Sequence, residues 1–159
     1  EKNKGHNIVV GLNYHDKLLT LNEWYRQIFA ESLGKNKKAI NYISAFGSID
    51  QHSQFQLFID GPRDKQFLFF KLNNSIKPIN SIKDLLLNNN LLSTLEKGAI
   101  KTLELEKFLV NQIVIEENFD DYSYLLIYLI FDIYLRAKNE KINFLDQPAV
   151  EVLKKNTRA

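Results

Sequence analysis

The chain contains no cysteine and no methionine among its 159 residues. Without cysteine it has no disulfide framework and no thiolate chemistry, and a reducing cytosol suits such a chain. The formal net charge is only +2, so neither nucleic acid nor an anionic membrane surface is predicted as a partner. The N-terminus is polar and shows no signal peptide. We therefore expect a cytoplasmic protein.

No apolar run reaches the roughly 20 residues that a helix needs to cross a bilayer. The longest run, residues 122–135, is interrupted by Asp132. It is apolar nearly all round, which predicts a helix buried on several sides. A central helix of this domain would explain the pattern, and so would a neighbouring domain or subunit outside this chain. The sequence does not begin with methionine, which indicates an excised, processed or truncated chain.

Short apolar segments alternate with amphipathic ones, and this alternation predicts the fold class. At 159 residues the chain is long enough for a single domain, 1–159, with its own core. Residues 73–80 are polar and predict a loop. Strands separated by helices indicate an α/β fold of three layers, with a mostly parallel sheet flanked by helices. We predict strands at 7–12, 41–46, 66–72 and 111–116, and helices at 17–32, 48–60, 91–109, 121–138 and 148–156.

Glu31 occupies the last turn of the first predicted helix, before Gly34, where a left-handed cap is expected. A carboxylate there faces the negative end of the helix dipole, which costs a few tenths to about 1 kcal/mol. One interpretation, favoured on spacing alone, is a solvated glutamate paired with Lys35. The other is a general base, since a disfavoured charged form suits a base that works near neutral pH. Residues 35–38 are basic and predict a solvated loop.

His52 is predicted in the first turn of the helix that begins at Ser48, where Gln51 completes a capping-box pattern. On sequence alone, a partly buried, hydrogen-bonded histidine is favoured over an acid–base catalyst, although histidine titrates nearest neutral pH. Metal ligation is not predicted, because there is no cysteine and no second histidine at ligand spacing. Lys154 lies in the last predicted helix, where most lysines are solvated.

Several ordered motifs resemble the C-terminal half of the bacterial-type glucose-6-phosphate isomerase family, over essentially the whole chain. The resemblance implies a sugar-isomerase (SIS) domain with flavodoxin-like layers and a helical tail from about residue 143. The motifs are Tyr14, Glu23-Trp24-Tyr25-Arg26-Gln27, Glu31-Ser32-Leu33-Gly34-Lys35, Asp50-Gln51-His52-Ser53-Gln54, Leu57, Asp60-Gly61-Pro62, Asp64-Lys65, Asn143 and Asp146-Gln147-Pro148-Ala149-Val150-Glu151.

The resemblance implies a role for four residues. Glu31 matches the carboxylate that moves a proton between the first two carbons of an open-chain sugar. His52 matches a histidine linked to ring opening, which in this family comes from the other subunit of a homodimer. Lys154 falls at the spacing of a lysine that assists ring opening, and Gln147 matches a glutamine of the substrate site. The implied substrate is a sugar phosphate, and no metal or organic cofactor is implied.

The sequence departs from the family at residues 144–145, Phe-Leu, where Pro-Phe is usual. Ala149 stands where glycine is also common, but some family members are similar here, so it does not count as a departure. The sequence also has neither the Ser/Thr-rich phosphate loop nor the Gly-Gly-Arg motif of the family's N-terminal half. A base without those partners forfeits most positioning and charge stabilisation. We therefore predict an isomerase part that is inactive without the N-terminal half. The alternative is a non-catalytic sugar-phosphate-binding module or a decayed remnant.

Overall fold

The computed structural model describes residues 5–37, 39–73 and 89–158, in which strands and helices alternate. The predicted strands and helices are confirmed to within a few residues, except for the helix predicted at 48–60. The loop predicted at 73–80 lies, beyond Asn73, outside the described residues. In chain order the elements are β1 (Ile8–Asn13), η2 (Asp16–Leu18), α1 (Leu19–Leu33), β2 (Asn41–Phe46), α2 (Gly47–Ser53), α3 (Phe55–Asp60), β3 (Lys65–Leu72), α5 (Asn89–Leu105), β4 (Val110–Ile115), α6 (Phe119–Asn139) and α7 (Pro148–Thr157).

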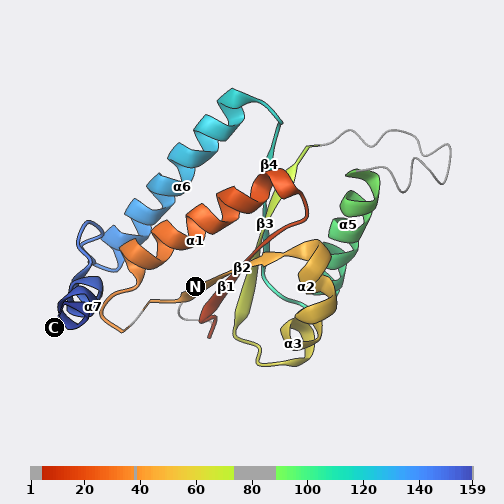
Figure 1. The fold of residues 1–159 in the computed structure, drawn as a ribbon. Coiled ribbons are helices and arrows are strands. Elements are labelled where there is room, and N and C mark those ends of the chain that lie inside the picture. Colours follow the sequence, from red (N-terminus) through yellow and green to blue (C-terminus); the bar gives the residue numbers. More distant parts are fainter. Residues whose placement is uncertain (1–4, 38, 74–88, 159) are drawn as a thin grey trace.

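The strands of the described part form one parallel sheet in the order β2-β1-β3-β4. β1 is central, and every residue from Val9 to Asn13 is buried. A strand covered on both faces has no polar face, which explains its continuous apolar sequence. Helices α1 and α6 lie on one face of the sheet, and α2, α3 and α5 lie on the other (Figure 1). The predicted three-layer α/β fold is confirmed.

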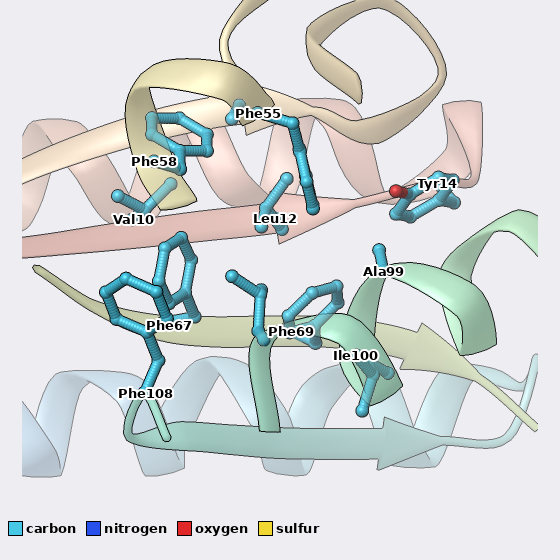
Figure 2. Packing of buried hydrophobic residues seen from close by; sticks show 12 residues of the cluster. Val10, Leu12, Tyr14, Phe55, Phe58, Phe67, Phe69, Ala99, Ile100 and Phe108 are labelled. Atoms are coloured by element: carbon cyan, nitrogen blue, oxygen red, sulfur yellow. The ribbon is translucent and has the colours of Figure 1, made fainter. Parts of the chain in front are cut away.

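Each face of the sheet has its own apolar core. On the side of α3 and α5, the Phe67 ring of β3 contacts Phe58 and Phe108, with ring centroids 5.7 and 5.3 Å apart (Figure 2). On the other side, Tyr25 and Phe29 of α1 belong to the same buried cluster as the apolar stripe of α6. These apolar contacts hold α1 and α6 against the sheet.

The long apolar run forms α6, but the sheet and α1 cover only one side of it. The buried stripe recurs every fourth residue: Leu125, Leu129, Ile133 and Ala137. Asp132 faces α1, where its Oδ2 accepts hydrogen bonds from Tyr25 Oη and Arg136 Nε, both at 2.7 Å. Ile127 and Phe131 are 65% and 55% exposed on the outer side. Burial on several sides, as predicted, is therefore wrong for this chain by itself.

No helix in the described ranges is long and apolar enough to span a membrane. Another correction concerns the helix predicted from Ser48. It begins at Gly47 and breaks at Gln54, which gives two short helices, α2 and α3. The Asp50 carboxylate accepts the Phe46 N–H at 2.7 Å, so the predicted Ser48–Gln51 capping box is wrong. His52 consequently lies in the last turn of α2 instead of the first.

Candidate active site

All strands of the sheet run in the same direction, so the sheet has an amino end and a carboxyl end, and the helices return from one to the other. α1 follows the carboxyl end of β1 and finishes beside the start of β2, at the amino end. α2 follows the carboxyl end of β2 directly. Glu31 and His52, the two predicted acid–base groups, therefore lie at opposite ends of the sheet.

Glu31 is exposed near the end of α1, and two amides hold its carboxylate. Gln27 Nε2, one turn earlier, donates to Oε1 at 3.0 Å. Gln147 Nε2 donates to Oε2 at 3.0 Å, from a residue 116 positions further along the chain. Lys35 makes its ion pair with Asp146 and not with Glu31, so the predicted Glu31–Lys35 pair is wrong.

Gly34 is the C-cap residue that ends α1, directly before Lys35. Its N–H donates to the Ala30 carbonyl at 2.9 Å, and its φ is −70°, so the predicted left-handed cap is wrong. A Cβ at this position would lie 2.4 Å from the Ala30 oxygen. Glycine is thus required because the Ala30 carbonyl of the last helical turn leaves no room for a Cβ, and not by a left-handed conformation.

Lys35 was predicted in a solvated loop, but its side chain is only 9% exposed. Its Nζ lies 3.0 Å from Asp146 Oδ1 and also donates to the Asn143 carbonyl. The turn after α1 is therefore tied to the segment before α7. We call Glu31, Lys35, Asp146 and Gln147 the amino-end cluster.

A cavity of about 550 Å³ lies between the end of α1 and this segment. Glu31, Lys35, Asp146 and Gln147 all line it, together with apolar groups such as Ile142 and Val150. The volume is within the range of small-molecule sites, and polar and apolar side chains both line the wall.

α7 begins at this cavity, with Gln147 as its N-cap and Pro148 in its first turn. None of its described residues is buried. Lys154, two turns into the helix, is 52% exposed and forms an ion pair with Glu151 at 2.7 Å. The structure thus brings Glu31 and Gln147 into contact and gives Lys154 a partner within its own helix.

His52 lies at the carboxyl end of the sheet, next to Gln51, which a buried tyrosine holds in place. Tyr14, fully buried after β1, donates from its hydroxyl to Gln51 Oε1 at 3.0 Å. Its ring lies against Gly47, where a Cβ would come within 2.2 Å of a ring carbon. The tyrosine therefore fixes the start of α2 and the residue before His52, while His52 itself is exposed.

Glu96 of α5 is the titratable residue that the sequence reasoning missed. It is 2% exposed, and its Oε1 has no hydrogen-bond partner within the described ranges. Burial raises its pKa to about 7, and Lys71, whose Nζ is 3.9 Å from Oε2, lowers the pKa in part. Burial, with a smaller contribution from Glu96, also raises the pKa of Tyr14. We call Tyr14, Gln51, His52, Lys71 and Glu96 the carboxyl-end cluster.

One signal for Glu96 was present in the sequence. It occupies a position at helical spacing among the apolar residues that face the sheet: Leu92, Leu95, Ala99, Ile100 and Leu103. A charged residue within such a stripe predicts a buried carboxyl group. Another buried titratable residue, His15, lies in the loop after β1; it is 5% exposed, and burial lowers its pKa.

The two clusters offer different chemistry. The amino-end cluster places a carboxylate, which can carry a proton, beside an amide and a cavity. The carboxyl-end cluster presents an imidazole on a rigid support. Within one chain the structure does not bring these two groups together.

The chain resembles known proteins along nearly its whole length, although no family model matches it. A probable glucose-6-phosphate isomerase of Methanococcus maripaludis is 32% identical over 160 residues, which cover 96% of this chain and 36% of that protein. The glucose-6-phosphate isomerase of Carboxydothermus hydrogenoformans is 31% identical, covering 98% and 38%. The chain therefore spans somewhat more than a third of the length of these relatives.

A solved structure shares the fold. The crystal structure of a hypothetical protein from Thermus thermophilus superposes with a TM-score of 0.79 at 24% sequence identity. The match covers 96% of this chain and 40% of the other. At this level of identity, the likeness concerns the arrangement of the sheet and helices.

Proposed function

We propose that this chain, a relative of the glucose-6-phosphate isomerases, is the C-terminal sugar-isomerase domain of such an enzyme. One observation carries the proposal: Gln147 donates a hydrogen bond to Glu31 at 3.0 Å although 116 positions separate them. Both match family positions in the active site, and both line the same cavity. A proton carrier and a substrate-binding amide need such a shared cavity.

The proposed reaction interconverts glucose 6-phosphate and fructose 6-phosphate through an enediol. In the open-chain aldose, the Glu31 carboxylate removes the proton from C2. The electrons of that C–H bond form the C1–C2 double bond, and O1 takes up a proton. Glu31 then returns its proton to C1 while the O2 hydroxyl loses its own, which gives the ketose. Gln147 orients the carboxylate and holds a substrate oxygen.

Ring opening needs a base at the O1 hydroxyl and an acid at the ring oxygen, and we assign this task to His52 and Lys154. Lys154 lies on α7, about one turn beyond the residues of that helix that line the cavity. His52 is at the other end of the sheet from Glu31 in the same chain. We therefore propose that His52 serves the active site of a second subunit in a homodimer.

Two exposed apolar surfaces support the proposal that the N-terminal half of the enzyme is a partner. The outer side of α6 exposes Ile127, Phe131 and other large apolar side chains. α7 has no buried residue among those described, and Leu153 is 65% exposed. Outward-facing helices of a finished domain are normally polar, and exposed apolar patches of this kind mark interfaces.

We also propose that the isolated chain is inactive. Glu31 and Gln147 are exposed, so water surrounds them in this chain alone. By the family resemblance, the phosphate loop and the arginine that stabilises the enediolate belong to the N-terminal half. Without them the base lacks substrate positioning and charge stabilisation.

A coupled assay for conversion of fructose 6-phosphate to glucose 6-phosphate tests the proposal. The chain is assayed alone and with a purified N-terminal half of the isomerase, each with wild-type Glu31 and with Glu31→Gln. We expect no activity from the chain alone, and activity with the N-terminal half that Glu31→Gln abolishes.

Two other outcomes would contradict parts of the proposal. Activity of the chain alone, lost in Glu31→Gln, would mean that the chain has its own phosphate site. Assembly with the N-terminal half without activity would favour the alternative of a non-catalytic module or remnant, and calorimetry with fructose 6-phosphate would then separate these two.

A further inference from the structure

We propose that Lys35 is a positioning residue that fixes Gln147 and α7 beside Glu31. The expected effect of Lys35 on catalysis rests on the proposed function, whereas its effect on the position of α7 does not. Lys35 was predicted as a solvated loop residue, and nothing in the family resemblance gave it a role.

The contacts of Lys35 join two distant parts of the chain. Its Nζ reaches Asp146 Oδ1 at 3.0 Å and donates to the Asn143 carbonyl, which is 108 positions away. Both partners precede Gln147 by only a few residues. The same ammonium group therefore holds both a side chain and the backbone of the segment that leads into α7.

α7 depends on this segment for its position. Earlier in the segment, the Ile142 N–H donates to the Ala137 carbonyl at 2.8 Å, and the Phe144 ring contacts Tyr134 at a centroid distance of 5.7 Å. These contacts place the start of the segment against α6. From Pro148 onward no described residue is buried, so Lys35 and the Gln147–Glu31 hydrogen bond are the polar ties nearest to α7.

A lysine suits this position for geometric reasons. Its long stem lets the Nζ lie against the segment while the side chain is only 9% exposed, and the ammonium has three donors for its partners. Asp146, by contrast, is 53% exposed. Water can solvate Asp146 when Lys35 is replaced, so the loss frees the segment without leaving a buried charge unpaired.

The first test measures position directly. Because the chain has no cysteine, Thr20→Cys and Lys155→Cys give a unique pair of exposed sites for nitroxide labels on α1 and α7. We expect Lys35→Met to broaden the distance distribution between the labels at least about twofold, and Lys35→Arg to restore most of the original width. An unchanged distribution in Lys35→Met would overturn the proposal.

The matched control is Lys17→Met. Lys17 also ties the region of α1 to a segment far along the chain, through Glu117, but its side chain is 61% exposed. Removing this exposed pair leaves the distribution as in the parent protein. Broadening in both variants would mean that any lost ion pair loosens α7, and the specific role of Lys35 would be wrong.

The second test uses the isomerase assembled with its N-terminal half. We expect Lys35→Met to lower kcat/KM about 10- to 100-fold, while Lys17→Met keeps the wild-type value. Unchanged kcat/KM beside a broadened distance distribution would overturn the catalytic part of the inference. If the assembled protein has no activity with any variant, the proposed function fails, and the label distances still decide whether Lys35 positions α7.

Discussion

The two ends of the sheet differ in how completely the chain builds them. At the amino end, Glu31, Asp146 and Gln147 are exposed, and α7 has no buried residue in its described part. At the carboxyl end, His52 is exposed, but its neighbour Gln51 accepts a hydrogen bond from the buried Tyr14, and Glu96 is only 2% exposed. The difference agrees with the proposal that the N-terminal half of the enzyme covers the amino-end cluster. The carboxyl-end cluster has its support within the chain's own core.

The largest effect on activity is expected from variants that disable Glu31 or His52, the acid–base groups at the two ends of the sheet. In the assembled isomerase, Glu31→Gln and His52→Asn should each lower kcat about 100-fold or more, since each removes a proton-transferring group. When the two variants are mixed and allowed to exchange subunits, half of the dimers are mixed and each contains one intact site. The mixture should recover about a quarter of the wild-type activity.

Both side chains are exposed, so unchanged thermal unfolding of each variant is the control for folding. No recovery on mixing would contradict the assignment of His52 to the partner's site. In that case the two ends of the sheet would not meet across a subunit interface, and the comparison between them would lose its functional meaning.

A second prediction concerns the surface on which the N-terminal half is proposed to dock. Ile127→Glu combined with Phe131→Glu on the outer side of α6 should weaken binding of the N-terminal half at least about 100-fold, because buried apolar anchors dominate interfaces. Titration calorimetry measures the affinity. Thr20→Glu, on the polar outer side of α1, is the matched control and should leave the affinity unchanged.

Equal affinity of the α6 double variant and the parent would contradict this assignment. The outer side of α6 would then face solvent, or a second copy of the chain, in the complete protein. Sedimentation of the chain alone distinguishes these two cases.

Local patterns were sufficient to predict the strands and most helices, because apolar spacing within ten to twenty residues determines them. They were not sufficient for the amino-end cluster. Glu31 and Gln147 are 116 positions apart, and only the family resemblance connected them. Lys35 was predicted to be solvated because its partners, Asn143 and Asp146, are distant in the sequence.

The remaining errors have a common physical cause. The all-round apolar sequence of α6 correctly predicted a helix, but composition cannot tell which side this chain covers and which side it leaves exposed. Glu96 was missed although its spacing places it among residues that face the core, because a charged side chain is ordinarily solvated. Sequence patterns record that a side chain is polar or apolar, whereas tertiary contacts decide what it meets.

A third prediction tests the buried acid at the carboxyl end. Burial raises the pKa of Glu96 from 4.5 to about 7, so the unfolded chain releases this proton at lower pH than the folded one. The contribution of Glu96 to the free energy of unfolding is therefore fully present below pH 4.5 and is lost as the pH rises to about 7. Glu96→Gln should remove this dependence and raise the free energy of unfolding at pH 8 by about 1–3 kcal/mol.

Urea unfolding at several pH values measures the effect, with Glu104→Gln, on the exposed side of α5, as control. A parent and a Glu96→Gln variant with parallel pH profiles would show that Glu96 is already ionised in the folded protein, paired with Lys71.

The smallest expected effect is the difference between a part-buried hydrogen bond at the carboxyl end and an exposed one at the amino end. Tyr14→Phe removes the hydroxyl of a buried tyrosine that donates to the partly buried Gln51 at 3.0 Å, and it should lower the free energy of unfolding by about 0.5–1.5 kcal/mol. Gln27→Met removes the amide that donates to Glu31 at 3.0 Å on the surface, and it should change stability by less than about 0.5 kcal/mol. Urea unfolding measures both. Equal losses would mean that the amino end is as firmly built within this chain as the carboxyl end, which the exposure of Glu31 and Gln147 argues against.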